Sequence, residues 1–168
     1  MQYKIMSDEF IILDVEKING YLCAIESLNG ADYPKVDYSF THLKNTGSLL
    51  KSIEGHIAAT YPNTVLDYWH IKIENINKSQ FRESIKTWFF RFGRAEVLRD
   101  QLKPLQDGFL ALLNQLVYTP QIYRINMIPP VWYATCWESI LLDSIMVYLC
   151  LNLTLMNDLY CAILRFYI

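Results

Sequence analysis

The sequence lacks the residue spacings that mark common catalytic and metal sites. It contains three histidines and four cysteines, but no His-x-x-x-His or Cys-x-x-Cys pattern that would indicate a zinc site. Also missing are the Gly-x-Ser-x-Gly elbow of serine hydrolases, the Gly-rich phosphate loop and the Gly-x-Gly-x-x-Gly nucleotide fingerprint. These absences argue against three large enzyme classes, and we expect no metal or cofactor. An enzyme whose site is dispersed along the chain leaves no such trace and stays open as an alternative.

A secretory leader and a membrane-spanning run are missing as well. Residues 1–6 lead directly into Ser7, Asp8 and Glu9 without the basic and apolar regions of a leader, which predicts a cytoplasmic protein. The longest uncharged run near the C-terminus, Ser144–Asn157, has 14 residues, whereas a bilayer span needs about 20. We therefore expect no membrane partner. In a reducing compartment the cysteines, which lie in apolar periodic segments, should be reduced core residues.

Charge is also scarce, at 19% of residues against 52% hydrophobic ones, which predicts a packed chain rather than a disordered one. Glycine and proline are scattered singly without a linker, so we expect one globular domain over residues 1–168. Residues 1–71 carry nine acidic and five basic side chains, residues 72–103 four and eight, and residues 104–168 four and two. This layout permits either an acidic surface for a basic partner or a basic stripe for nucleic acid.

Apolar residues recur at helical spacing in three longer segments and one short one, in which Leu49, Ile53 and Ile57 predict a helix that ends at Tyr61-Pro62-Asn63. The spacing predicts amphipathic helices over residues 15–29, 79–92 and 98–117. Within the third segment, Pro104 indicates either a kink or the first turn of a new helix, and the unbroken period favours the kink.

Strand signals are weaker and shorter. β-branched and aromatic residues alternate with their neighbours over Val65–Ile73 and Ile122–Ile128, which predicts two strands able to pair antiparallel. The segment Ala31–Phe40, with Pro34 and three aromatic residues, is expected to be a loop.

The C-terminal part is the most apolar, with 28 hydrophobic residues among the 38 of positions 131–168. We interpret residues 131–165 as a buried helical hairpin around which the amphipathic helices pack. The predicted fold is therefore mainly α: a helical bundle around a C-terminal apolar helical hairpin, with a minor antiparallel β element. An α+β fold is the alternative.

Glu138 and Asp143 are unexpected in so apolar a segment, because a buried charge is costly unless it is paired. We expect them to form a narrow solvated stripe or an ion pair with an arginine of residues 72–103. The alternative is an acidic contact site.

Basic residues recur along the segment 78–99, where they predict a solvated helix face. The alternative function that they suggest is that of a nucleic-acid-binding accessory protein, although such a protein is usually basic overall and this chain has a net charge of −2. The basic residues are Lys78, Arg82, Lys86, Arg91, Arg94 and Arg99.

Aromatic residues are abundant, with 12 tyrosines and 4 tryptophans, and several lie beside acids where no period demands burial. Aromatic side chains are enriched at protein interfaces and nearby acids steer a basic partner, although rings in loops can also simply cap the core. We therefore predict a non-enzymatic protein-binding module, a small cytoplasmic inhibitor that neutralises a toxin or nuclease in the manner of a bacterial immunity protein. The candidate interface residues are Asp32, Tyr33, Asp37, Tyr38, Tyr61, Asp67 and Tyr68.

Overall fold

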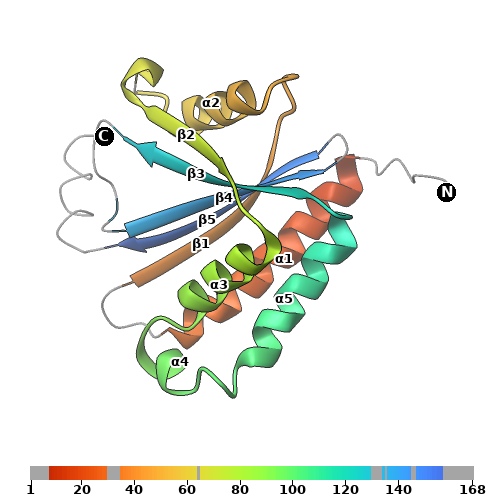
Figure 1. Cartoon of the computed structure of the whole chain (residues 1–168), viewed down its shortest axis with the longest axis vertical. Helices are drawn as coiled ribbons and strands as arrows, with labels where there is room; N and C mark the ends of the chain where they lie inside the picture. Colours follow the sequence, from red (N-terminus) through yellow and green to blue (C-terminus); the bar gives the residue numbers. More distant parts are fainter. Residues whose placement is uncertain are drawn as a thin grey trace.

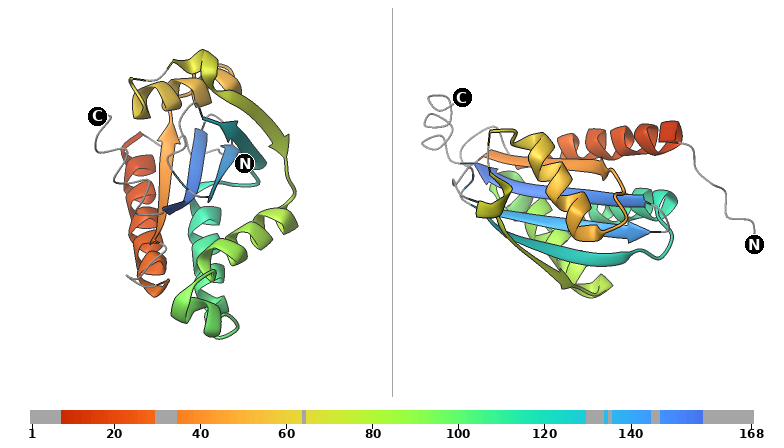
Figure 2. Two further views of the ribbon diagram at one scale, coloured as in Figure 1. Left: turned by 90° about the vertical axis from the view of Figure 1, so that its left-hand side faces the viewer. Right: turned by 90° about the horizontal axis from the view of Figure 1, so that it is seen from above.

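A single antiparallel sheet of five strands organises the chain in the computed structural model, which describes residues 8–29, 35–63, 65–129, 134, 136–144 and 147–156. The strand order is β1-β5-β4-β3-β2. Four helices cover one face, and the fifth helix, with a short 3₁₀ turn, lies on the other (Figures 1 and 2). The elements are α1 (Asp8–Leu28), β1 (Lys35–Leu43), α2 (Leu49–Thr60), η1 (Leu66–Tyr68), β2 (His70–Asn75), α3 (Lys78–Phe89), α4 (Gly93–Val97), α5 (Lys103–Leu116), β3 (Gln121–Ile128), β4 (Cys136–Ser144) and β5 (Val147–Met156).

This α+β architecture contradicts the predicted helical bundle. In place of a helical hairpin over 131–165, the described part of that segment is the β-hairpin β4–β5, with Ser144 opposite Val147. The hairpin lies in the middle of the sheet, where β5 pairs with β1 and β4 pairs with β3. Both faces of these strands are covered over much of their length, so apolar residues follow one another without the polar alternation of an exposed strand. Such a run has the composition of a buried helix, which explains the error.

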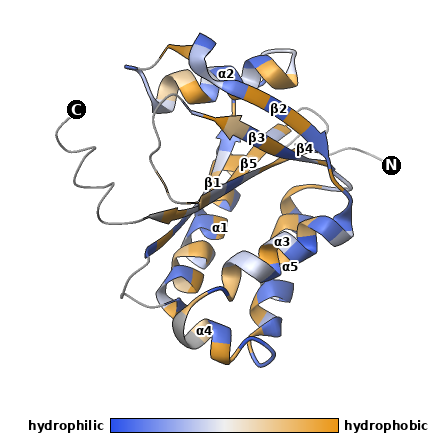
Figure 3. Ribbon diagram, turned by 60° about the vertical axis from the view of Figure 1, so that its left-hand side comes forward, coloured by the Kyte–Doolittle hydropathy of each residue, from blue (hydrophilic) through white to orange (hydrophobic). Residues whose placement is uncertain are grey.

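Period-two alternation is nevertheless present in β5. Leu149, Leu151, Leu153 and Leu155 are buried against the helical layer, while the residues between them face the other side. Figure 3 shows the resulting mixture of hydrophobic and hydrophilic residues along the strands. The two faces of the sheet therefore have different chemistry.

A second prediction is also wrong, the loop over Ala31–Phe40. Residues 35–40 belong to β1, which forms one edge of the sheet. Val36, Tyr38 and Phe40 alternate with exposed residues and are at most 5% exposed. They belong to the main core, which joins the helical layer to the sheet. Residues 30–34 lie outside the described part of the chain.

The other elements match the predictions more closely. The helices α3 and α5 lie within or close to two predicted helical segments, and β3 coincides with the second predicted strand. The helix α1 covers most of the segment 15–29 but already begins at Asp8. Pro104 lies in the first turn of α5 and opens a new helix, so the favoured kink is wrong. The strand predicted over Val65–Ile73 is shorter, because η1 occupies its first part, but β2 does pair antiparallel with β3.

Local capping explains where α3 begins. The Asn77 side chain accepts a hydrogen bond from the backbone N–H of Gln80, and the Gln80 side chain accepts one from the N–H of Asn77, at 2.9 and 2.8 Å. This reciprocal capping satisfies two amides that the first helical turn leaves without partners. None of the described helices is both long and apolar enough to cross a membrane.

The cysteines only partly follow the prediction that they are core residues. Cys150 is buried, Cys136 is half-buried and Cys23 is exposed on α1. Cys161 lies outside the described residues. The three described cysteines are free thiols.

Candidate functional site

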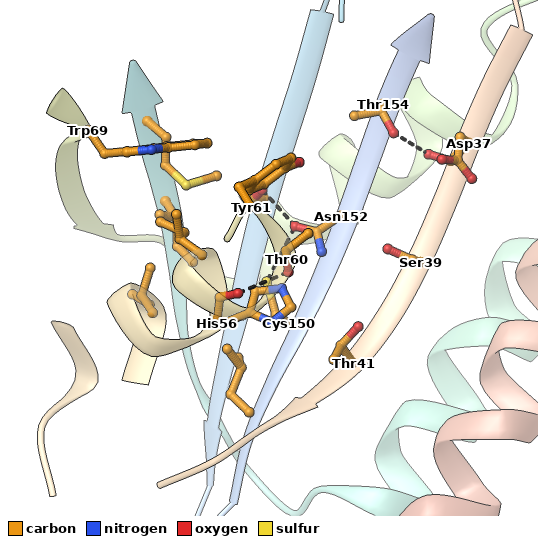
Figure 4. A pocket seen from close by; sticks show the side chains of 16 residues that line it. Asp37, Ser39, Thr41, His56, Thr60, Tyr61, Trp69, Cys150, Asn152 and Thr154 are labelled. Atoms are coloured by element: carbon orange, nitrogen blue, oxygen red, sulfur yellow. Dashed lines mark hydrogen bonds between the residues drawn. The ribbon is translucent and has the colours of Figure 1, made fainter. Parts of the chain in front are cut away.

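The least covered face of the sheet is the one beneath α2, where a cavity of about 330 Å³ lies between the helix and strands β1, β3, β4 and β5 (Figure 4). We call it the α2 cleft. Its polar lining residues are Asp37, Ser39, Thr41, His56, Thr60, Ser139, Asn152 and Thr154, and its other lining residues are Leu43, Ile53, Ile57, Tyr61, Trp69, Ile125, Met127 and Cys150.

Strand alternation places the polar residues in the cleft. Asp37, Ser39 and Thr41 occupy the odd positions of β1 and face α2, while the even positions face α1 and the core. In β5, Asn152 and Thr154 lie opposite Ser39 and Asp37 in the strand register. A strip of small polar side chains therefore runs across two neighbouring strands (Figure 4).

Several of these polar groups are fixed by hydrogen bonds. The Thr154 hydroxyl donates to the Asp37 carbonyl oxygen at 2.7 Å. Ser139 donates to the Asn152 side-chain oxygen at 2.8 Å, and the Cys150 thiol lies 3.5 Å from the same oxygen. The hydroxyls of Ser39 and Thr41 form no hydrogen bond to another described residue. These two hydroxyls, each a donor and an acceptor, are available to a bound molecule.

One end of the cleft is aromatic and apolar. The Tyr61 and Trp69 rings lie 5.3 Å apart at an angle of 33°. Trp69 is 7% exposed and belongs to the smaller core, which α2 forms with this face of the sheet. The polarity of the cleft lining therefore changes along its length. Polar side chains line it over β1 and β5, and aromatic and aliphatic side chains line it beside η1.

Burial favours the neutral forms of two titratable groups in the cleft, Cys150 and His56. Burial raises the pKa of the Cys150 thiol to about 12, so it stays protonated at neutral pH. Burial lowers the pKa of His56, which favours the neutral imidazole. In the described part of the chain no group of three His, Cys, Asp or Glu residues is placed to hold a metal ion.

Four of the seven predicted interface residues lie in or beside the α2 cleft. Asp37 and Tyr61 line the cleft, and Asp67 and Tyr68 lie in η1, next to the lining residue Trp69. Tyr68 is 64% exposed.

Tyr38, in contrast, points to the opposite face of β1 and is buried, with its hydroxyl donating to the Trp88 carbonyl oxygen at 2.5 Å. It takes no part in the surface around the cleft. Asp32 and Tyr33 lie outside the described residues.

The acids of residues 1–71 are mostly on the other side of the molecule. Five of the nine lie in α1, which covers the helical face of the sheet, and Asp37 is the only carboxylate that lines the cleft among the described residues. The cleft is therefore close to neutral. Sequence charge counting could not reveal this, because it does not separate the two faces.

Three of the basic residues predicted to form a solvated helix face are indeed exposed on α3, but they lie away from the cleft. Lys78, Arg82 and Lys86 are exposed along α3, in the helical layer. The Arg91 guanidinium lies 4.9 Å from the centre of the Trp88 ring. Arg99 donates to the Phe90 carbonyl oxygen at 3.0 Å, and Arg94 lies in α4.

Glu138 is paired, although not with an arginine of residues 72–103. Its carboxylate accepts hydrogen bonds from Arg124 Nε at 2.8 Å, Ser84 Oγ at 2.9 Å and Trp88 Nε1 at 2.8 Å. These bonds connect α3 to β3 and β4. Asp143 is half-buried on β4, and burial raises its pKa.

Of the eight polar lining residues only Asp37 was predicted as a site residue. Four of the others lie on β1 and β5: Ser39, Thr41, Asn152 and Thr154. Their signal was the alternation of polar and apolar residues in the segments 35–43 and 147–156. Once those segments are recognised as strands, the same alternation assigns the polar residues to one face.

Crystal structures of citrus MAF1 resemble this chain in fold. One, in space group C 2 2 21, has a TM-score of 0.58 at 10% sequence identity and covers 86% of this chain and 99% of that one. Another, in space group P 31 2 1, has a TM-score of 0.54 at 8% identity, with 85% and 98% covered. No protein-family model matches the sequence, and no curated protein matches it. The likeness confirms the α+β architecture, and at this identity it shows the fold alone.

Proposed function

We propose that the chain is a non-catalytic protein-binding module that holds a segment of another protein in the α2 cleft. The observation that carries the proposal is the polar strip over β1 and β5. The helical face of these strands is filled by core residues, whereas the opposite face offers the hydroxyls of Ser39 and Thr41, which bond to no described residue, beside a cavity. A solvated face of an antiparallel sheet also carries polar side chains, so the cavity beside these hydroxyls is the feature that favours a bound segment.

The chemistry of the cleft defines the segment that it fits. Asp37 favours a lysine or arginine side chain at the polar end. Tyr61, Trp69 and Met127 favour an apolar side chain at the other end, and Ser39 and Thr41 can bond to peptide groups between the two. The segment therefore presents one cationic and one apolar residue.

Catalysis is the competing interpretation, because Cys150, His56 and Asn152 all line the cleft. Their environment favours binding instead. A thiol with a pKa of about 12 is a poor nucleophile, and its sulfur lies 3.5 Å from the Asn152 side-chain oxygen, which is no base.

The test places a photo-crosslinking residue at Ser39 and, as a matched control, at Gln115, which is exposed on α5 on the opposite side of the sheet. We expect one protein of fixed stoichiometry to crosslink from position 39 and not from position 115. Equal crosslinking from both positions, or none from position 39, would refute the proposal. Melting temperatures of both variants control for folding.

The narrower prediction, a cytoplasmic inhibitor of a basic toxin or nuclease, is tested with the captured protein. Its activity is measured with and without an equimolar amount of this chain. We expect full inhibition at one equivalent; undiminished activity contradicts inhibition while leaving the binding proposal intact.

A further inference from the structure

The two edges of the sheet are closed to different degrees. Along β1, the Asn19 side chain donates to the Phe40 carbonyl oxygen at 2.9 Å and accepts from the Phe40 N–H at 2.8 Å. The Tyr38 N–H donates to the Glu26 carboxylate. Side chains of α1 thus satisfy three backbone groups in the middle of this edge strand, which hinders another strand from pairing there.

The edge at β2 has no such cover in the described part of the chain. The Ile76 N–H donates to the Ile122 carbonyl oxygen at 2.9 Å, and the register of β2 with β3 is continuous with this pair. Since hydrogen-bonded residues alternate in an antiparallel ladder, Lys72 and Glu74 bond to β3 while Ile71, Ile73 and Asn75 direct their N–H and C=O groups outward. Figure 2 shows β2 at the margin of the sheet.

We propose that this edge pairs with the same edge of a second copy of the chain, antiparallel and about a two-fold axis at Ile73. Two sheets would join into one that continues across the axis. This interface is separate from the α2 cleft and is independent of the proposed function.

Hydrogen-bond geometry limits the possible registers. Only residues whose backbone groups point outward can form hydrogen-bonded pairs, so Ile71, Ile73 and Asn75 must face one another across the axis. An axis at Ile73 pairs all three of these residues, axes at Lys72 and at Glu74 pair two of them, and axes at Ile71 and at Asn75 pair only one.

The charges of Lys72 and Glu74 favour one of these registers over the others. With the axis at Ile73, Lys72 of each copy lies directly opposite Glu74 of the other, and both side chains are exposed. An axis at Lys72 would place two lysines opposite each other, and an axis at Glu74 would place two glutamates there. Opposite charges directly across strands stabilise the pair and like charges destabilise it. The edge is therefore complementary to itself in a single register.

The interface is small, because β2 has 6 residues. It supplies about six backbone hydrogen bonds and two charge pairs. An interface of this size supports a weak, reversible dimer. We expect self-association to rise with protein concentration and to weaken with added salt.

The test uses charge reversal with complementation. In a dimer of the Lys72→Glu variant, each glutamate introduced at position 72 lies opposite Glu74 of the other copy. In a dimer of the Glu74→Lys variant, each lysine introduced at position 74 lies opposite Lys72 of the other copy. Each variant alone should self-associate about tenfold more weakly than the wild-type chain. An equimolar mixture of the two variants should form heterodimers, because every facing pair is again opposite in charge. Sedimentation velocity measures both results, and melting temperatures confirm folding.

Ile73→Pro provides a second variant, since proline removes an outward N–H and leaves the bonds to β3 intact. It should be monomeric. The proposal is overturned if the wild-type chain stays monomeric at every concentration, whether or not β2 then pairs with a strand of a different protein. It is also overturned if either charge variant dimerises as the wild type does, or if the mixture shows no heterodimer.

Discussion

Glu138 should be among the most stabilising polar residues of the fold, because its carboxylate joins the helical layer to the sheet. The side chains of Glu138 and Arg124 are 16% and 28% exposed, and Trp88 and Ser84, which also donate to the carboxylate, are 4% and 8% exposed. Glu138→Ala removes three hydrogen bonds, so the Arg124 Nε–H, the Trp88 indole N–H and the Ser84 hydroxyl lose this acceptor, and only the Arg124 Nη2 bond to Ser84 Oγ at 3.2 Å is kept. Breaking a buried ion pair costs about 3–5 kcal/mol. Partial exposure of Arg124 favours the lower end, a loss of about 3 kcal/mol in the free energy of unfolding.

Urea unfolding monitored by tryptophan fluorescence measures this loss. The matched control is Asp107→Ala, which breaks the exposed pair of Lys103 and Asp107 at 2.6 Å and should cost about 0.5 kcal/mol or less. Replacing both Arg124 and Glu138 by methionine should recover part of the loss, since no charge is then left unpaired. A Glu138→Ala cost equal to that of Asp107→Ala would refute the reasoning.

Three other predictions concern the edge of the sheet and the titratable groups. Asn19→Ala should destabilise the fold by about 1–2 kcal/mol and speed hydrogen exchange at the Phe40 amide; unchanged exchange would show that Asn19 does not close the edge. Cys23 should react with a thiol reagent in the folded protein, whereas Cys150 should react only as fast as the chain unfolds; rapid labelling of Cys150 would contradict its burial. Burial lowers the pKa of His56 below its usual 6.5, so the unfolded chain binds the proton more tightly and stability is lost as the pH falls below about 6.5. His56→Gln should remove that part of the pH dependence, and an identical pH dependence in the two proteins would contradict it.

The helices were predictable because their signal is local. A stripe such as that of α3, with Phe81, Ile85 and Trp88 on one side, follows from spacing within a dozen residues. The central strands were not predictable in the same way. In β5, leucines and a cysteine replace the β-branched residues that mark strands, and partners distant in sequence on both sides of it decide its structure.

The contacts within the site were difficult to predict for the same reason, because they join segments that are distant in sequence. The pairing of Glu138 was predictable from the cost of a buried charge, but its partner Arg124 is placed by the register of β3 with β4. The α2 cleft likewise depends on β1 lying beside β5, which places Ser39 opposite Asn152 although 113 positions separate them in the sequence. Asp37 and Tyr61 were identified from composition, and only the fold shows that they line one cavity.

The central claim, that the α2 cleft is the partner-binding surface, is tested most directly by comparing two arginine substitutions in binding measurements with the captured partner. Ser39→Arg puts a long cationic side chain into the cleft, and Gln115→Arg puts the same side chain on the exposed side of α5. If the cleft holds a cationic segment, Ser39→Arg should weaken binding at least about tenfold while Gln115→Arg leaves the Kd unchanged. Equal Kd values for both variants and the wild-type chain would contradict the account.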